Sequence, residues 1–326
     1  MRIIVDAFGG DNAPKEILLG CAMAHEEFGV DIILSGQPRL IEECAKENKI
    51  DTGAMEILPA SQIMPVSAAP ADILKKYKDS SMAVGLRALA QGQGQAFVSA
   101  GSTGALVMGA TFIIKRIAGI KRTAIGSALP TNSRPVFLID MGANADCKPE
   151  YLHQFALMGD IYMKKILNVE CPRVALANIG TEDTKGDTLR LEAFDFMKRA
   201  GYNFIGNIEA RDIPLGVCDV VVADGFTGNI ILKMYEGVAA ALMANIKGIF
   251  KKNLLTKLSA LAVKDGLTDL KNRMDYTEFG GAPLMGVRAP VIKAHGSSNA
   301  KAIKNAIGQA KYFAERDLIK SISESL

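Results

Sequence analysis

The stretch VVADGFTGNIILK, Val221–Lys233, joins two patterns that are typical of different secondary structures. Val221–Asp224 resembles the end of a buried strand, and the residues from Ile230 onward have the pattern of a helix. Between them lies Gly225–Asn229, in which only Phe226 is bulky. Because backbone N–H groups at the start of a helix can bind phosphate or another oxyanion, this short junction predicts an anion site.

The same alternation of strand and helix recurs along the rest of the chain. Apolar, β-rich runs occupy residues 3–5, 31–34, 96–100, 135–140, 173–179, 204–208, 219–224 and 290–294. Helical patterns occupy residues 15–27, 82–90, 104–115, 150–167, 188–199, 230–250 and 300–315. Several runs are apolar almost throughout, as expected for strands covered on both faces. The alternation predicts an α/β fold with three layers (α/β/α), Rossmann-like, with a mostly parallel sheet.

We predict a single α/β domain over residues 1–326, with an inserted helical segment at about 246–274. The apolar residues Ile249, Phe250, Leu254, Leu258, Leu261 and Ala262 of this segment fall at steps of one, three or four, which gives one face of a helix. From Lys247 to Lys264 there are five lysines and no acidic residue. A basic amphipathic helix suits a membrane surface or an acidic protein partner. A helical hairpin packed on a second subunit, with solvated lysines, explains the pattern equally well, and the two roles can coexist.

Composition excludes several classes of protein. Hydrophobic residues make up 49% of the chain, charged residues 22%, and the net charge of +3 is too small to imply nucleic-acid binding. No apolar run is long enough for a transmembrane helix, and the N-terminus lacks the pattern of a signal peptide. The five cysteines and three histidines are scattered without metal-ligand spacing, so we expect no metal, no disulfide and a cytoplasmic location.

Glycine-containing polar loops follow six of the predicted strands. They lie at residues 6–14, 101–104, 141–149, 180–187, 225–229 and 295–299. One such loop is more often an ordinary turn and helix cap, but ligands of open α/β sheets bind beyond the carboxyl ends of the strands, where these loops would meet. The sequence has no Walker loop, no G-x-G-x-x-G after its first strand and no G-x-S-x-G. It therefore favours a small anion over a nucleotide or a serine nucleophile.

Seven segments in order resemble the phosphate acyltransferases of bacterial phospholipid synthesis, the PlsX family. They are IIVDAFGGDNAP, VSAGSTGAL, DMGANADCKPEYL, NIGTEDTKGD, VVADGFTGNIILK, FGGAPLMGV and VIKAHGSS, and the similarity runs from Arg2 to about Ala310. The resemblance implies transfer of a long-chain acyl group from acyl carrier protein to inorganic phosphate, giving acyl phosphate, without a cofactor. It also implies a fold like that of phosphotransacetylases and isocitrate/isopropylmalate dehydrogenases. Homodimers in the cytoplasm, in some members attached to the inner membrane surface, are expected.

Phosphate is already a nucleophile, so the reaction needs only binding, orientation and stabilisation of the oxyanion. We expect two cradles of donors, formed by Gly101, Ser102, Thr103 and Gly104 and by Gly225, Thr227, Gly228 and Asn229. For each cradle, an empty helix cap is the alternative.

Further candidates come from the remaining loops. Lys185 would neutralise phosphate or the oxyanion, and Asn144 would orient a substrate; a surface lysine and a simple turn are the alternatives. Asp6 and Asp11 would position a lysine or a loop N–H group, unless they are structural carboxylates. His295 would protonate the departing thiolate, with a backbone-bonded imidazole as the alternative.

Acyl carrier protein is acidic, so its docking surface should be basic. The candidates are Lys247, Lys251, Lys252, Lys257, Arg273 and Arg288. The leucines Leu254, Leu255, Leu258 and Leu261 would enter lipid or line an acyl groove. An isopropylmalate-like NAD(P)-dependent dehydrogenase is the alternative enzyme, and a membrane-bound scaffold without enzymatic activity is the alternative outside enzymes.

Overall fold

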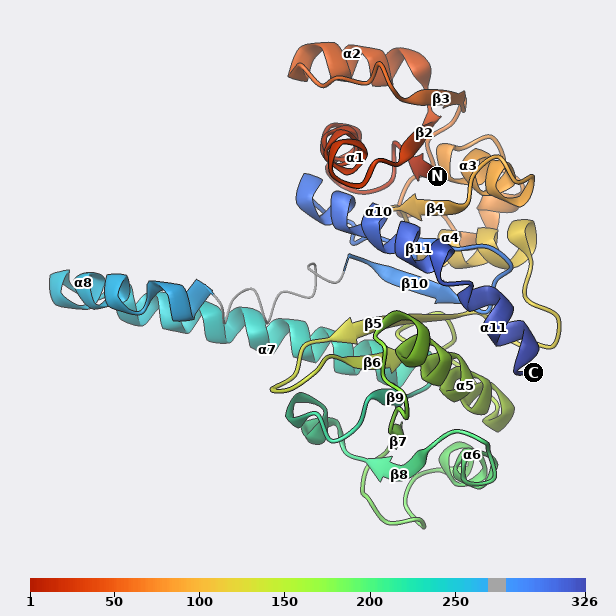
Figure 1. Ribbon diagram of the computed structural model, residues 1–326, viewed down its shortest axis with the longest axis vertical. Coiled ribbons are helices and arrows are strands. Elements are labelled where there is room, and N and C mark those ends of the chain that lie inside the picture. Colours follow the sequence, from red (N-terminus) through yellow and green to blue (C-terminus); the bar gives the residue numbers. More distant parts are fainter. Residues whose placement is uncertain (269–279) are drawn as a thin grey trace.

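The computed structural model describes residues 1–268 and 280–326, apart from the side chains of Leu254 and Ala262, and shows a sheet between two helical layers (Figure 1). The strands are β1 (Arg2–Asp6), β2 (Asp31–Gly36), β3 (Glu56–Pro59), β4 (Ala96–Ser99), β5 (Ala124–Leu129), β6 (Val136–Ile139), β7 (Val174–Ala177), β8 (Phe204–Ile208), β9 (Val220–Val222), β10 (Ala282–Met285) and β11 (Val291–Lys293). Their order across the sheet is β3-β2-β1-β4-β11-β10-β5-β6-β9-β7-β8.

The helices connect and cover these strands. They are α1 (Lys15–Phe28), α2 (Pro38–Asn48), α3 (Ser81–Ala90), α4 (Thr103–Gly109), α5 (Pro149–Ile166), α6 (Thr188–Lys198), α7 (Gly225–Lys251), α8 (Leu254–Ala262), α10 (Ala300–Glu315) and α11 (Leu318–Glu324). Short 3₁₀ turns lie at η1 (Pro70–Leu74) and η3 (Ala210–Leu215), and α4 runs on into a π-helical turn, η2 (Ala110–Ile114).

Two apolar cores lie on the two faces of the sheet. Because side chains alternate along a strand, Ile3 and Val5 belong to one core and Ile4 to the other. Each core also contains residues from the far half of the sheet, such as Phe137 in the first and Leu138 in the second. The three-layer α/β prediction is therefore confirmed, and both cores run continuously across the sheet.

Every predicted strand and helix has a counterpart in the structure. The sequence patterns missed β3, β5, β10, α2 and α11. Two of the missed strands have compositions that argue against a strand, because β5 contains Gly126 and Ser127 and β10 contains Pro283. They nevertheless join the two halves of the sheet.

The sheet changes direction at its centre. Strand β10 is antiparallel to both β11 and β5, and β5 is antiparallel to β6, whereas the other strand pairs among the described residues are parallel. The parallel strands on the two sides therefore run in opposite senses along the ladder. The prediction that all six loops open on one edge holds only in part: loops after β4 and β11 share a cavity with residues after β6 and β9, but the loop after β7 does not reach it.

An arm projects from the body, formed by residues 237–268 (Figure 1). It comprises the distal part of α7 with α8 packed along it, and a further helical turn at 264–268. The predicted insertion began near residue 246, but the helix that carries it is continuous from Gly225. Residues 269–274 of the predicted insertion lie outside the described residues.

Candidate active site

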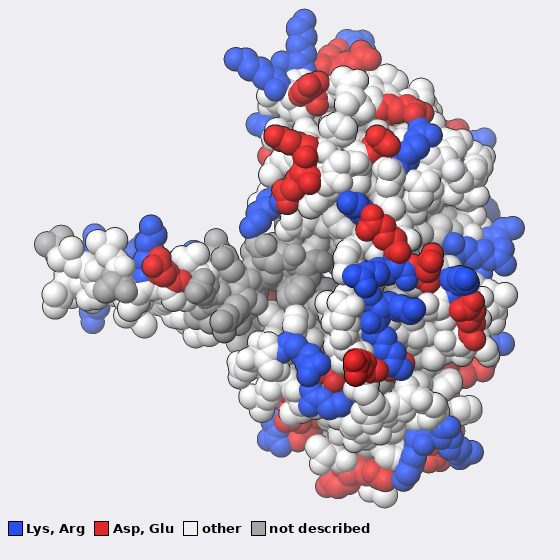
Figure 2. All heavy atoms as spheres, in the orientation of Figure 1, with Lys and Arg blue, Asp and Glu red and all other residues white. Residues whose placement is uncertain are grey.

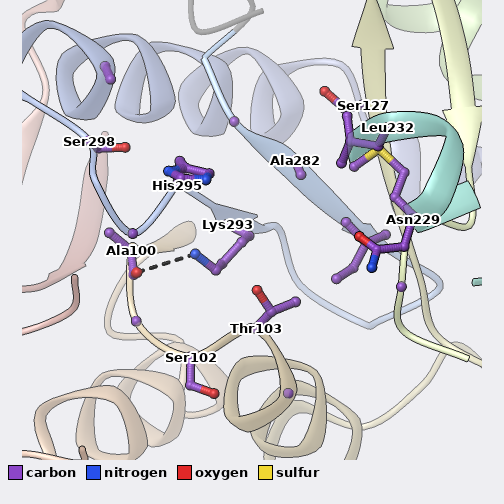
Figure 3. Close-up of a pocket in the computed structure, with 18 of the residues that line it drawn as sticks. Ala100, Ser102, Thr103, Ser127, Asn229, Leu232, Ala282, Lys293, His295 and Ser298 are labelled. Carbon is purple, nitrogen blue, oxygen red and sulfur yellow. Dashed lines mark hydrogen bonds between the residues drawn. The ribbon is translucent and has the colours of Figure 1, made fainter. Parts of the chain in front are cut away.

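A cavity of about 580 Å³ lies where the two halves of the sheet meet (Figure 3). It opens beside the first turn of α4, the loop after β11 and the start of α7. Its polar lining residues are Asp11, Ser102, Thr103, Ser127, Asn229, Lys233, Glu236, Lys293, His295 and Ser298. Apolar side chains line it as well, among them Val66, Ile125, Met141, Leu232 and Ala282. The cavity thus offers both donors for an anion and an apolar wall.

The predicted cradle after β4 lines this cavity with all four of its residues, Gly101–Gly104. Helix α4 begins at Thr103, and no described residue accepts a hydrogen bond from the N–H groups of Ser102, Thr103 or Gly104. The first N–H groups of a helix have no partner inside the helix, and the positive end of the helix dipole favours an anion. These three amides are therefore available to a ligand in the cavity.

Asp6 fixes this cradle from behind. The Ser99 hydroxyl donates to Asp6 Oδ2 at 2.7 Å, and the Gly101 N–H donates to Ser99 Oγ at 3.0 Å. Burial raises the pKa of Asp6, and hydrogen bonds from serine hydroxyls and from Phe8 N–H oppose that rise. Asp6 does not line the cavity, whereas Asp11 does, and the N–H of Asp11 donates to Gly296 O at 2.8 Å.

The second predicted cradle differs from the first. Asp224 caps α7 by accepting from the N–H of Thr227 at 2.9 Å, the Gly225 N–H donates to Asn144 O at 2.7 Å, and the Gly228 N–H donates to Asp224 O at 2.9 Å. The prediction of outward N–H groups at Gly225, Thr227 and Gly228 is therefore wrong, because each bonds within the chain. The helix begins five residues earlier than predicted, and none of these three residues lines the cavity.

Close packing explains the glycines of this turn. A Cβ atom at Gly228 would lie 1.9 Å from the carbonyl oxygen of Asp140. The helix start thus presses directly on the chain that follows β6, and Asn229, the next residue, lines the cavity. Asn229 faces the cavity from the side opposite Thr103 (Figure 3).

Asn144 and Lys185 do not line the cavity. The Asn144 amide donates to Thr123 O at 2.8 Å and to Asp140 Oδ2 at 2.9 Å, which is a structural use of the side chain. Asp140 is fully buried and also accepts from the N–H groups of three neighbours, although burial raises its pKa. Lys185 is 48% exposed and lies 3.9 Å from Glu182.

His295 lines the cavity, and Ser297 contacts its ring. Its Nδ1 lies 2.8 Å from the Ser297 hydroxyl oxygen and 3.2 Å from the Ser297 backbone nitrogen, so Ser297 engages this side of the ring. Burial and the nearby charge of Lys233 lower the pKa of His295 below its usual value. A lowered pKa disfavours the charged imidazolium, which argues against the predicted role as the acid that protonates a thiolate.

Lys293 is a charged cavity residue that sequence analysis missed. It lies at the end of β11, and its Nζ donates to Ala100 O at 3.2 Å and to Ala294 O (Figure 3). Burial lowers the pKa of Lys293 to about 8, against the opposing effect of the Asp6 and Asp11 carboxylates. A lysine at the end of an apolar strand was the available signal in the sequence.

Arg190 is a second residue that sequence analysis missed, and it holds the start of α7. Its guanidinium donates to Asp224 Oδ2 at 2.5 Å and to Thr227 Oγ1 at 2.8 Å. The same group reaches Asp187 and the carbonyl oxygen of Ala177. Arg190 thus ties α6 and the end of β7 to the turn that presents Asn229.

Neither a metal cluster nor a membrane-spanning helix is found among residues 1–268 and 280–326. No group of three or more His, Cys, Asp or Glu residues within that part of the chain is arranged to hold a metal ion. None of its helices is both long and apolar enough to cross a membrane.

Comparison with known proteins identifies the family. The model of the fatty acid synthesis protein family matches residues 1–321. The chain is 47% identical over 326 residues to a phosphate acyltransferase of Thermoanaerobacterium thermosaccharolyticum, covering 100% of this chain and 97% of the relative. The chain belongs to this family of phosphate acyltransferases. A phosphate acyltransferase of Lysinibacillus sphaericus is also 47% identical, over 100% of this chain and 98% of its own.

Solved structures share the fold at low sequence identity. The EutD phosphotransacetylase of Staphylococcus aureus superposes with a TM-score of 0.65 at 16% identity, covering 96% of this chain and 94% of that one. A 4-hydroxythreonine-4-phosphate dehydrogenase from Salmonella typhimurium gives 0.56 at 13% identity, covering 96% and 98%. The chain therefore shares its fold with phosphotransacetylases and with a dehydrogenase.

Proposed function

We propose that the protein transfers a long-chain fatty acyl group from acyl carrier protein to inorganic phosphate, releasing acyl phosphate. One observation carries the proposal: the amides of Ser102–Gly104, for which no described residue is an acceptor, share a cavity with Asn229 and Lys293. That arrangement supplies donors and positive charge for phosphate, and a carboxamide for the thioester oxygen. Membership of the phosphate acyltransferase family supports the same reaction.

Bound phosphate attacks the thioester carbon directly, without an acyl-enzyme. Phosphate sits against the N–H groups of Ser102–Gly104, and the acyl chain extends along the apolar wall near Val66 and Leu232. Holding the two reactants in line contributes roughly 7–11 kcal/mol. A donor placed at the developing oxyanion, here the Asn229 amide, contributes about 3–4 kcal/mol.

In this proposal the arm binds other molecules, with α7 contacting a second copy of the chain and α8 contacting the membrane. Helix α7 exposes an apolar stripe, which we call the α7 stripe, at Phe226, Ile230, Met234, Val238 and Leu242. These residues recur every four positions and so lie close to one face, which is suited to a second copy of the chain. The homodimer would bury this stripe.

Helix α8 suits the anionic inner surface of the cell membrane. Leu255, Leu258 and Leu261 are exposed, and Figure 2 shows a largely uncharged arm surface with scattered lysines. Lys247, Lys251, Lys257 and Lys264 line one cavity of about 380 Å³ between the two arm helices. Leucines dip into lipid while lysines approach the headgroups. Lys252 is exposed beside them, and Leu254 begins α8 with its side chain outside the described part.

Acyl carrier protein is proposed to dock on the same basic arm. Arg288 is not part of that surface, because its Nε donates to Arg116 O and it lines a separate cavity with Gln95 and Lys320. Arg273 lies outside the described residues.

The test is incubation of the pure protein with palmitoyl carrier protein and phosphate, with acyl phosphate trapped as hydroxamate. Asn229→Ala should lower kcat by about 10²–10³-fold, because it removes a donor that lines the cavity. Lys185→Ala is the matched control and should stay near wild type, since Lys185 lies outside the lining. Absence of phosphate-dependent hydroxamate from the wild-type protein would overturn the proposed function.

A further inference from the structure

The proposed reaction requires a proton to move from the attacking phosphate to the departing sulfur. When hydrogen phosphate attacks a thioester, a C–O bond forms, the C–S bond breaks, and the products are an acyl phosphate dianion and a thiol. The proton that the phosphate carried must therefore end on the sulfur. A group in the cavity that can both give and take a proton would connect the two ends of the reaction.

Among the described lining residues, few can do this. Lys233 is engaged by Glu236 at 2.8 Å. Ser297 engages the Nδ1 of His295, and burial lowers the pKa of the ring, which disfavours its proton-donating form. Asp11 is exposed to solvent rather than buried beside the cradle.

Lys293 lies deeper than these groups. Its ammonium has three N–H donors, and two are directed at the carbonyl oxygens of Ala100 and Ala294. The third can point into the cavity, beside the cradle of Ser102–Gly104 (Figure 3). Ala100 lies two residues before Ser102, so the contact holds the ammonium near the proposed phosphate position.

The surroundings of Lys293 bring its pKa closer to neutral pH. Burial lowers its pKa to about 8, Lys233 on α7 lowers it further, and the carboxylates of Asp6 and Asp11 oppose the shift. His295 and Glu236 also face the cavity. A group that both donates and accepts a proton is most effective when its pKa is close to the working pH.

We propose that Lys293 is a catalytic residue that transfers the proton of the attacking hydrogen phosphate to the departing sulfur. The ammonium protonates the thiolate as the C–S bond breaks, and the resulting amine takes the proton from the phosphate oxygen, which restores the ammonium. No net proton, electron or co-reactant is needed. This inference rests on the proposed acyl transfer to phosphate and adds the residue that carries its proton.

The experiment compares wild type with Lys293→Arg and Lys293→Met on two palmitoyl donors. One donor is palmitoyl carrier protein, whose alkyl thiolate needs a proton, and the other is the palmitoyl thioester of 5-thio-2-nitrobenzoate, whose thiolate leaves without one. With the carrier protein, both variants should lose about 10²–10⁴-fold in kcat. With the aryl thioester, the loss should shrink to below about tenfold. Lys293→Arg retains the positive charge, so its KM for phosphate should stay within about threefold of wild type.

The pH profile gives an independent readout. Because the ammonium form falls as pH rises through the lowered pKa, kcat of the wild type with carrier protein should decline above about pH 8. Neither variant should show that limb, since arginine stays charged and methionine has no proton. Lys320→Met, a change at an exposed lysine of α11, is the control and should match wild type with both donors.

Three results would overturn the role. They are Lys293→Arg with near wild-type kcat on carrier protein, equal losses on both donors, and a wild-type profile that stays flat above about pH 8. Failure of the wild type to make acyl phosphate from either donor would instead overturn the proposed function itself.

Discussion

The two ends of α7 have opposite surroundings. At its start, Asp224 and Arg190 are only 8% and 13% exposed, and the backbone of Gly228 presses against Asp140. Beyond Glu236, Met243 and Ile246 line a cavity that α7 shares with α8 and the turn after it, whereas Val238 and Leu242 on the α7 stripe are exposed. One continuous helix therefore combines a packed anchor for Asn229 with an arm whose apolar side chains are exposed.

Glycines have different structural roles at the two ends of α7. At the anchor, small residues permit close backbone packing, and the charged groups are paired because they are buried. On the arm, a glycine such as Gly237 has no atom within 4 Å of where a Cβ would lie. Substitutions of the same kind should thus have opposite consequences at the two ends.

The largest effect is expected at the ion pair of the anchor. Arg190→Met leaves the buried Asp224 carboxylate without its cation, which should lower the free energy of unfolding by about 3–5 kcal/mol. Urea unfolding followed by circular dichroism measures it. Arg211→Met, which removes an ion pair between Glu209 and a 79% exposed arginine, should cost no more than about 1 kcal/mol. Equal costs for the two changes would contradict the idea of a buried anchor.

A smaller effect is expected at the glycine of the anchor. Gly228→Ala places a methyl group 1.9 Å from Asp140 O, and relief of that clash should cost about 1–3 kcal/mol and displace Asn229, lowering activity. Gly237→Ala on the arm meets nothing and should raise helix stability by about 1 kcal/mol. Thermal unfolding and the hydroxamate assay report both. A Gly228→Ala protein as stable and active as Gly237→Ala would remove the contrast between the two ends.

The sequence was sufficient for the body of the fold because periodicity depends on local burial. The centres of strands such as β1 and β4 are apolar, and α10 keeps one apolar face, so each was predicted. Strand β10 was missed because Pro283 argues against a central strand, yet pairing with β5 and β11 tolerates it.

The site was only partly predictable, for a different reason. Loop composition indicates which segments carry polar groups, but side-chain direction depends on tertiary contacts. Ser102 and Asn229 lie together in the cavity, whereas the Asn144 amide turns back to Asp140 and Lys185 turns toward Glu182. Lys293 was overlooked because its burial arises from the pairing of β11 with β4, at a distance in the sequence.

The smallest effect on the fold, and the sharpest test of the arm, comes from charges on its two faces. Met234→Glu with Val238→Glu replaces residues of the α7 stripe that are 65% and 57% exposed, so the monomer should unfold almost as wild type does. Leu258→Glu with Leu261→Glu changes exposed residues of α8 in the same way.

If the α7 stripe contacts a second copy and α8 contacts lipid, the first pair should abolish dimers in sedimentation without abolishing vesicle binding. The second pair should abolish binding to phosphatidylglycerol vesicles while dimers persist, because added negative charge repels an anionic surface and removes the buried apolar area. Dimers and vesicle binding that both survive both pairs would mean that the arm's apolar residues serve neither association, and the two ends of α7 would then differ in packing alone.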